Sequence, residues 1–173
     1  MDDLDSRGRP RFFGKYRGVV VDADDEQHRG RLRVRVPAVL GELEVWAMPC
    51  VPYAGRRRGL FLLPEPNTGV WVEFEGGHPS YPIWTGCFWA EDDLEAAEAK
   101  PSVKSLRTET FWLRIDDEKG EISIEADGDT RIVLTAIDLS LESSTVLAKG
   151  ANGRKVEVSA TAVSINDGAL EVT

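Results

Sequence analysis

The segment Thr68–Trp89 places the strongest constraint on the fold of this chain. Val70, Val72 and Phe74 alternate with Trp71, Glu73 and Glu75, which is the period of a strand with two different faces. A glycine pair at 76–77 interrupts the strand, and a second apolar run follows at 83–89. The pattern predicts a β-hairpin in the core of a small closed barrel. Three of the five tryptophans fall within it, and we expect them to belong to that core: Trp71, Trp84 and Trp89.

The remainder of residues 12–90 has the same strand-like character. Further runs at 16–25, 29–37 and 41–53 are joined by loops that contain glycine and proline. Five or six short strands in one domain suit a closed barrel of the oligonucleotide/oligosaccharide-binding (OB) type. Residues 1–11 are charged and poor in apolar side chains, so we predict a flexible N-terminal arm.

Two basic groups lie within this domain. In the first, three arginines alternate with apolar residues on one strand: Arg31, Arg33 and Arg35. This basic face either binds a ligand or lies at a solvated or subunit-facing surface, paired with the acidic turn nearby, and we favour the second interpretation. In the second group, Arg56, Arg57 and Arg58 form a loop between two glycines. This loop is either a contact with another subunit or a hub protein, or a solvated loop.

The second half of the chain has a different composition. Residues 91–107 predict a linker with a possible short helix that Pro101 would end. From residue 108 to 173, short alternating strands follow one another with small polar turns. One such chain would have little core and two open sheet edges. Identical chains wound about a common axis would pair these edges and pool the apolar faces. We therefore favour an intertwined β-helix over a monomeric sandwich.

The charge is distributed unevenly between the halves. Residues 1–90 carry 12 basic and 12 acidic residues, whereas residues 91–173 carry 9 and 18. Because an acidic surface repels phosphate, nucleic acid is an unfavourable partner for the second half. The N-terminal sequence lacks a hydrophobic segment, so we expect synthesis in the cytoplasm. Cys50 and Cys87 lie in apolar runs and predict two buried, reduced thiols rather than a disulfide or a zinc site.

Three segments of the first half resemble a known family: Arg29–Pro37 (RGRLRVRVP), Trp46–Tyr53 (WAMPCVPY) and Thr68–Gly86 (TGVWVEFEGGHPSYPIWTG). They look like the OB-fold module of the phage baseplate central spike, or baseplate assembly protein V, which also occurs in VgrG-type spikes of contractile injection systems. The second half is similar to the family's β-helix entry. There, Arg107 and Thr108 precede an alternating strand (FWLRI) and an Asp-Asp turn.

The resemblance implies an all-β fold, with an N-terminal OB-fold barrel at 12–90 and a C-terminal intertwined trimeric β-helix, or needle, at 108–173. It implies a structural central spike: a homotrimer that links the inner tube and hub proteins of a baseplate to a tip protein and pierces the target envelope. Contact with the target membrane would be transient. Such a spike assembles in the cytoplasm of the producing cell and then becomes part of a phage-tail-like particle.

Some spikes of this family end in a His-x-His metal site, but no histidine follows His78 here. We therefore expect a blunt end that docks a PAAR-type tip protein. The residues that would dock it are the last five of the sequence: Ala169, Leu170, Glu171, Val172 and Thr173.

No catalytic motif is recognisable, and the two histidines, His28 and His78, fall in predicted polar turns. The sequence thus predicts no enzyme, no cofactor and no metal site. The alternative function is an OB-fold module that binds nucleic acid or carbohydrate on an oligomeric β stalk. The arginines and tryptophans of the first half favour this alternative. A third possibility is a structural adaptor or cell-surface stalk that does not pierce a membrane.

Overall fold

The computed structural model describes residue 4 and residues 8–127, 130–167 and 169–172. The chain divides into two compact units, Met1–Asp93 and Leu94–Thr173. Each unit is described by itself below.

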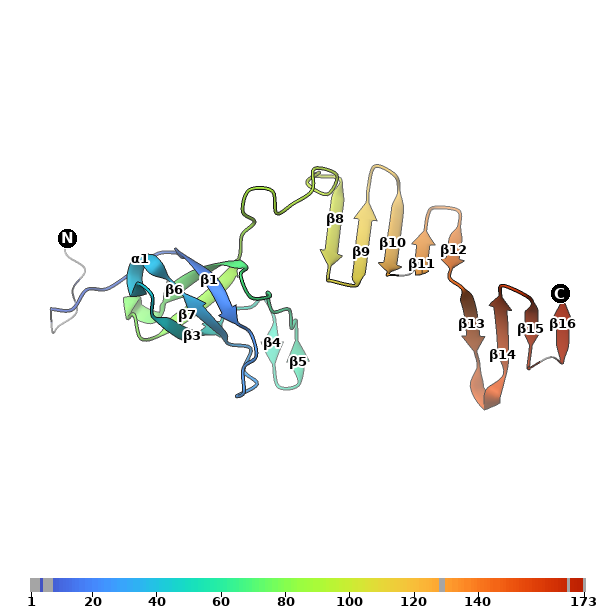
Figure 1. Ribbon diagram of the computed structural model, residues 1–173, viewed down its shortest axis with the longest axis horizontal. Helices are drawn as coiled ribbons and strands as arrows, with labels where there is room; N and C mark the ends of the chain where they lie inside the picture. Colours follow the sequence, from blue (N-terminus) through green and yellow to red (C-terminus); the bar gives the residue numbers. More distant parts are fainter. Residues whose placement is uncertain (1–3, 5–7, 128–129, 168, 173) are drawn as a thin grey trace. The chain divides into compact units, whose positions relative to one another are not determined.

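The first unit contains a closed five-stranded barrel in the strand order β1-β2-β3-β7-β6 (Figure 1). Its strands are β1 (Tyr16–Asp22), β2 (Leu32–Arg35), β3 (Glu44–Pro49), β6 (Gly69–Phe74) and β7 (Pro82–Cys87). A short helix α1 (Pro37–Leu40) connects β2 to β3, and a 3₁₀ turn η1 (Glu75–Gly77) connects β6 to β7. Strands β4 (Ala54–Gly55) and β5 (Arg58–Gly59) form a separate hairpin. The predicted OB-like closed barrel is confirmed.

The barrel closes because β3 pairs in parallel with β7, while the other neighbouring strands pair antiparallel. Closure leaves no open edge in this sheet. The alternation read from the sequence places every second side chain of β2 and β6 in the interior. The buried core consists of Val20, Leu32, Val34, Val36, Ala47, Val70, Val72, Phe74 and Trp84.

Only one of the three tryptophans expected in the barrel core belongs to it. Trp84 is buried, whereas Trp89 is 72% exposed because it lies beyond the end of β7. Trp71 alternates with buried Val70 and Val72, so it points out of the barrel and packs on Phe88 with 5.0 Å between ring centroids. The predicted core position of Trp71 and Trp89 is therefore wrong.

The two cysteines are free thiols, but both are exposed, so the prediction of buried thiols is wrong. Cys50 lies just after the last residue of β3, and Cys87 is the last residue of β7. Their apolar sequence neighbours predicted burial, but both cysteines lie at strand ends, where the side chains are outside the barrel interior.

The predicted arm at 1–11 is described in part, because residues 1–3 and 5–7 lie outside the described residues. Its C-terminal end attaches to the barrel. The Arg11 guanidinium donates a hydrogen bond to the Gly76 carbonyl oxygen, and the Phe12 N–H donates to that of Gly77 at 2.8 Å.

The second unit contains two antiparallel sheets built from consecutive hairpins (Figure 1). The first, in the order β12-β11-β10-β9-β8, comprises β8 (Val103–Arg107), β9 (Phe111–Asp116), β10 (Glu121–Ala126), β11 (Thr130–Leu134) and β12 (Leu139–Glu142). The second, in the order β13-β14-β15-β16, comprises β13 (Thr145–Lys149), β14 (Lys155–Ser159), β15 (Val163–Ile165) and β16 (Leu170–Val172), with a 3₁₀ turn η2 (Ala151–Gly153).

The segment predicted as a linker, 91–107, differs from the expectation at its C-terminal end. Strand β8 lies within it and pairs with β9, where Leu106 faces Leu113. The segment contains no α-helix. Instead, a turn forms at Glu95, whose carbonyl oxygen accepts hydrogen bonds from the N–H groups of Glu98 (2.9 Å) and Ala99 (3.0 Å). The alternation in β8 spans only five residues, so the strand depends on pairing with β9.

Candidate functional site

The five-stranded sheet of the second unit has one face of aliphatic side chains in two rows that cross its strands. The strand register aligns Ile115, Ile122, Leu134 and Leu139 in one row. It aligns Leu106, Leu113, Ile124, Ile132 and Leu141 in the next row. Each of these nine side chains leaves between 38% and 64% of its surface exposed. We refer to them as the apolar rows.

Exposure on this scale is unusual for aliphatic side chains that lie side by side. Scattered exposed leucines are common on soluble proteins, but contiguous apolar patches mark surfaces that contact another molecule. The apolar rows are contiguous, because cross-strand neighbours in a sheet lie ~5 Å apart. This face is therefore a candidate assembly surface.

The opposite face of the same sheet is polar, and charged groups on it form ion pairs within the chain. Arg114 Nη2 lies 2.9 Å from Asp116 Oδ2, and Arg114 Nε lies 3.8 Å from Glu98 Oε1. The Trp112 ring packs between two guanidinium groups, at 5.0 Å from Arg107 and 5.8 Å from Arg114. Burial alone would raise the pKa of Asp116, but hydrogen bonds from the Lys119 N–H and from Arg114 hold it below its usual value. Ion pairs and cation–π contacts within the chain thus serve the charged groups of this face, whereas the buried Trp112 Nε1 has no hydrogen-bond partner among the described residues.

The four-stranded sheet repeats this arrangement. The register aligns Val146, Val158 and Val163 in one row, and Ala148, Val156, Ile165 and Leu170 in the next. Several of these side chains are exposed: Ala148, Val156, Val158, Val163 and Leu170. The alternation noted in the sequence therefore gives each sheet of the second unit one apolar, partly uncovered face.

The predicted arginine stripe, Arg31, Arg33 and Arg35, lies in and just before β2, and each arginine pairs with a carboxylate of the same unit. Arg31 Nη2 lies 2.5 Å from Asp25 Oδ1, and Arg35 Nη1 lies 3.2 Å from Glu42 Oε2. Arg33 lies between two carboxylates, at 3.3 Å from Asp22 and 3.7 Å from Glu44. The predicted pairing with the nearby acidic turn is confirmed for Arg31 and Arg33, whereas Arg35 pairs with Glu42 outside that turn.

Asp25 is the buried centre of that turn. Its carboxylate accepts hydrogen bonds from the Arg31 side chain and from the backbone N–H groups of Gln27, Arg29 and Arg31. These donors, the Arg31 side chain first, hold the pKa of Asp25 well below its usual range although burial opposes them. Asp25 therefore fixes the loop between β1 and β2.

The second predicted basic group forms the turn of the β4–β5 hairpin. Within the part of the chain that the structure describes, Arg56, Arg57 and Arg58 form no ion pair. A groove of about 550 Å³ lies beside the hairpin. Its lining includes two of these arginines and a set of largely apolar residues from distant segments: Pro49, Val51, Tyr53, Leu60, Phe61, Leu62, Leu63 and Trp84. We call it the hairpin groove.

Sequence reasoning found the arginines of the hairpin groove but missed its apolar lining. The available signal was the run Leu60–Leu63, which follows the basic loop and belongs to no strand. His28, predicted in a polar turn, also lines this groove. His78 lies in the β6–β7 connection, where its Nδ1 accepts a hydrogen bond from the Ser80 N–H at 3.2 Å.

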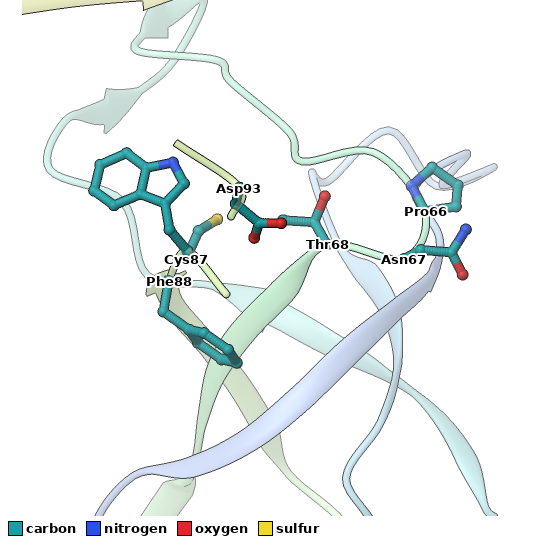
Figure 2. Close-up of a pocket in the computed structure, with 7 residues that line it drawn as sticks. Pro66, Asn67, Thr68, Cys87, Phe88 and Asp93 are labelled. Atoms are coloured by element: carbon teal, nitrogen blue, oxygen red, sulfur yellow. The ribbon is translucent and has the colours of Figure 1, made fainter. Parts of the chain in front are cut away.

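A second pocket, of about 490 Å³, lies where the chain enters β6 and leaves β7 (Figure 2). It is lined by Pro66, Asn67, Thr68, Cys87, Phe88, Trp89 and Asp93. Partial burial and, secondarily, the negative charge of Glu65 raise the pKa of the Cys87 thiol. A raised pKa leaves less thiolate at neutral pH, which disfavours Cys87 as a nucleophile.

The predicted tip-docking residues lie at the last strand. Residues 169–172 include β16, which forms the edge of the four-stranded sheet, and Thr173 lies outside the described residues. Among the described residues, no group of three or more His, Cys, Asp or Glu side chains is arranged to hold a metal ion. The same residues include no helix long and apolar enough to cross a membrane.

Comparison with known proteins finds a similarity for the first unit. Residues 16–89, which span β1 through the end of β7, match the family model described as the type VI secretion system/phage-baseplate injector OB domain. No curated protein matches the chain. The match covers the closed barrel with its β4–β5 hairpin. Residues 16–89 are thus similar to the injector OB domain of type VI secretion systems and phage baseplates.

Proposed function

We propose that the chain is the structural central spike of a phage-tail baseplate or another contractile injection system, and that it acts as a homotrimer. Its second unit would form an intertwined β-helix, with the apolar faces of three chains turned toward a common axis. The observation that carries the proposal is the pair of apolar rows, which no described part of the chain covers. The family of residues 16–89 supports the baseplate role.

The energetics favour association through these rows. Full burial of an aliphatic side chain contributes ~1.5–3 kcal/mol, so covering nine half-exposed ones contributes on the order of 10 kcal/mol per chain before the cost of association. The polar faces would turn outward, where their ion pairs remain hydrated. An acidic exterior would keep the needle soluble, since residues 91–173 carry twice as many acidic as basic residues.

The proposed needle has a length suited to piercing. If the strands of both sheets succeed one another along one axis at ~4.8 Å each, they span roughly 40 Å, which exceeds the ~30 Å hydrocarbon layer of a bilayer. Contact with the target membrane would be transient. At the far end, the edge strand β16 would present unpaired backbone groups that a PAAR-type tip protein could cover. The barrel would face the inner tube and hub.

The alternative, an OB module that binds nucleic acid or carbohydrate, has less support. The three arginines of the stripe are each paired with carboxylates of the same chain. Trp84 is buried, and Trp71 is covered by Phe88 and by Arg17, whose guanidinium lies 5.7 Å from the Trp71 ring. These three arginines are therefore occupied by carboxylates, and Trp71 and Trp84 are not free to stack on a base. A salt-sensitive gel shift with single-stranded DNA at micromolar protein would restore this alternative.

The proposed function is tested in the producing cell. Particles are purified from cells with the intact gene and from cells in which it is deleted, and their composition is measured by mass spectrometry. The proposal predicts that the chain co-purifies with tube and sheath proteins and that deletion abolishes assembled particles. Normal particles in the deletion strain, complete in all other components, would contradict it.

A further inference from the structure

The hairpin groove presents apolar side chains to solvent in the first unit. Phe61 is 74% exposed, and Tyr53, Leu60 and Leu62 are exposed as well. The floor is rigid, because the Trp84 indole N–H donates a hydrogen bond of 3.1 Å to the Gly30 carbonyl oxygen. The groove is therefore a preformed apolar surface.

Several backbone N–H groups beside this groove also lack a backbone acceptor among the described residues. Leu60 donates its N–H to the Tyr53 carbonyl oxygen at 2.9 Å. The N–H groups of the next three residues, Phe61–Leu63, donate to no backbone acceptor among the described residues. N–H groups without a backbone acceptor can pair with an added strand, while side-chain pockets beside them select the sequence. The groove thus suits an extended peptide segment.

The charge of the rim specifies that segment further. Arg31, Arg33 and Arg35 have carboxylate partners, whereas Arg56–Arg58 have none in the described part of the chain. Three adjacent positive charges without partners favour an acidic occupant. The occupant is therefore expected to be extended, acidic and to carry a large apolar side chain.

The chain itself contains an acidic segment with a large apolar side chain at Trp89–Asp93 (WAEDD). In its own protomer this segment forms a turn, with Asp92 at φ +67, and it would have to extend to pair as a strand. Trp89 is 72% exposed, and no ion pair joins Glu91 or Asp92 to any other described residue. Within its own protomer, the segment lies at the other pocket, where Asp93 Oδ2 accepts a hydrogen bond from the Ala90 N–H at 2.5 Å. The hairpin groove and the acidic segment that would complement it thus lie at two different places on one chain.

We propose that the hairpin groove of one protomer binds the Trp89–Asp93 segment of a neighbouring copy of the chain, with Arg56–Arg58 facing Glu91 and Asp92. Because the two surfaces differ, the contact is head-to-tail, and three such contacts close a ring. This inference rests on the proposed homotrimer and adds a specific contact between its barrels. The apolar rows would hold the needle together, and the hairpin contact would orient the barrels around it.

Zero-length crosslinking of the intact protein tests the contact. The variant Arg57→Lys/Arg58→Lys supplies amines that a carbodiimide can couple to carboxylates within ion-pair distance. Protein labelled with ¹⁴N is mixed with ¹⁵N-labelled protein, unfolded and refolded together, so that crosslinks between copies carry both labels. The native pair Lys15 and Glu73, whose Nζ and Oε1 atoms lie 2.8 Å apart, serves as the internal control for a crosslink within one chain.

The inference predicts mixed-label crosslinks between the lysines introduced at 57–58 and Glu91 or Asp92. Substituting Phe61→Glu in the same background should lower their yield about tenfold, since it places a negative charge against the acidic occupant. Leu43→Glu, a change at another exposed apolar residue of the first unit, should leave the yield unchanged. Crosslinks of a single label only, no crosslink at these carboxylates, or equal yields from both variants would overturn the inference.

The solution mass, measured on the same samples, separates this inference from the proposed function. A mass of three chains without the mixed-label crosslink leaves the homotrimer standing and overturns the hairpin contact. A mass of one chain overturns both.

Discussion

The indole N–H of Trp84 donates a hydrogen bond of 3.1 Å to the carbonyl oxygen of Gly30, and this joins strand β7 to the loop between β1 and β2. Gly30 has φ +71, a conformation in which most other residues would be strained. The bond is buried and connects residues far apart in the sequence. It therefore couples the barrel core to the loop that lines the hairpin groove.

Replacing Trp84 by phenylalanine should destabilise the barrel. The substitution leaves the Gly30 carbonyl without its donor and removes part of a buried ring, which together cost about 2–4 kcal/mol. Urea unfolding followed by circular dichroism measures the change in the free energy of unfolding. Trp89→Phe is the matched control, since its exposed ring should contribute less than ~0.5 kcal/mol. Equal effects of the two substitutions would contradict the role of the Trp84 contact.

The carboxylate of Asp25 makes the stability of the barrel depend on pH. Its pKa is held well below the usual range in the folded state, so between that pKa and about pH 4 the unfolded chain binds more protons than the folded one. The stability that Asp25 contributes is thus complete above about pH 4 and is lost as the pH falls further.

Thermal unfolding at about pH 6 and about pH 3 measures this contribution. The wild-type protein should lose more stability between the two pH values than the Asp25→Asn variant, which lacks the titrating carboxyl. Asp24→Asn, a change at the exposed neighbour, should behave like the wild type. If Asp25→Asn retained the full pH dependence, the buried ion pair with Arg31 would not be its source.

Gly69 is required by close packing rather than by its backbone conformation. A Cβ atom at this position would lie 2.6 Å from the ring of Phe88, which packs on Trp71. Gly69→Ala should therefore cost about 1–3 kcal/mol of unfolding free energy by overpacking. Gly55→Ala, where the added Cβ would lie 4.0 Å from the Arg58 carbonyl oxygen, is the control and should change stability little. A neutral Gly69→Ala would show that Phe88 moves freely.

The parts of the fold that follow from local patterns were predictable from the sequence. Alternation alone indicates that Val70 and Val72 point inward and that Ile122 and Ile124 share one face, and the structure confirms both. Local patterns failed where a strand ends. Cys87 and Trp89 belong to an apolar run of the sequence. Strand β7 ends at Cys87, before that run ends, so both residues are exposed. Strand β8 was missed because its five residues become a strand only by pairing with β9.

The hairpin groove illustrates what a sequence pattern cannot provide. Its lining combines Arg57 and Phe61 with His28 and Trp84, which are separated by more than twenty residues in each direction. Only the closed barrel brings them together. The arginines were recognisable as a charged loop, but the apolar surface beside them depends on tertiary packing.

The apolar rows should be sensitive to charge on one face of the sheet only. Ile124→Asp would place a carboxylate in the proposed interior of the trimer, and three copies would meet there, so we expect dissociation to monomers. Ser140→Asp places the same group on the opposite, polar face of β12, where it should be tolerated. Analytical ultracentrifugation of both variants measures the result. A trimer that survived Ile124→Asp would show that this row lies outside the interface.

The mass of the intact protein in solution tests the central claim most directly. If the apolar rows are covered by two further copies of the chain, light scattering after size-exclusion chromatography should give three times the 19.1 kDa mass of one chain, independent of dilution into the low micromolar range. A mass of one chain, or of two, would contradict the homotrimeric spike.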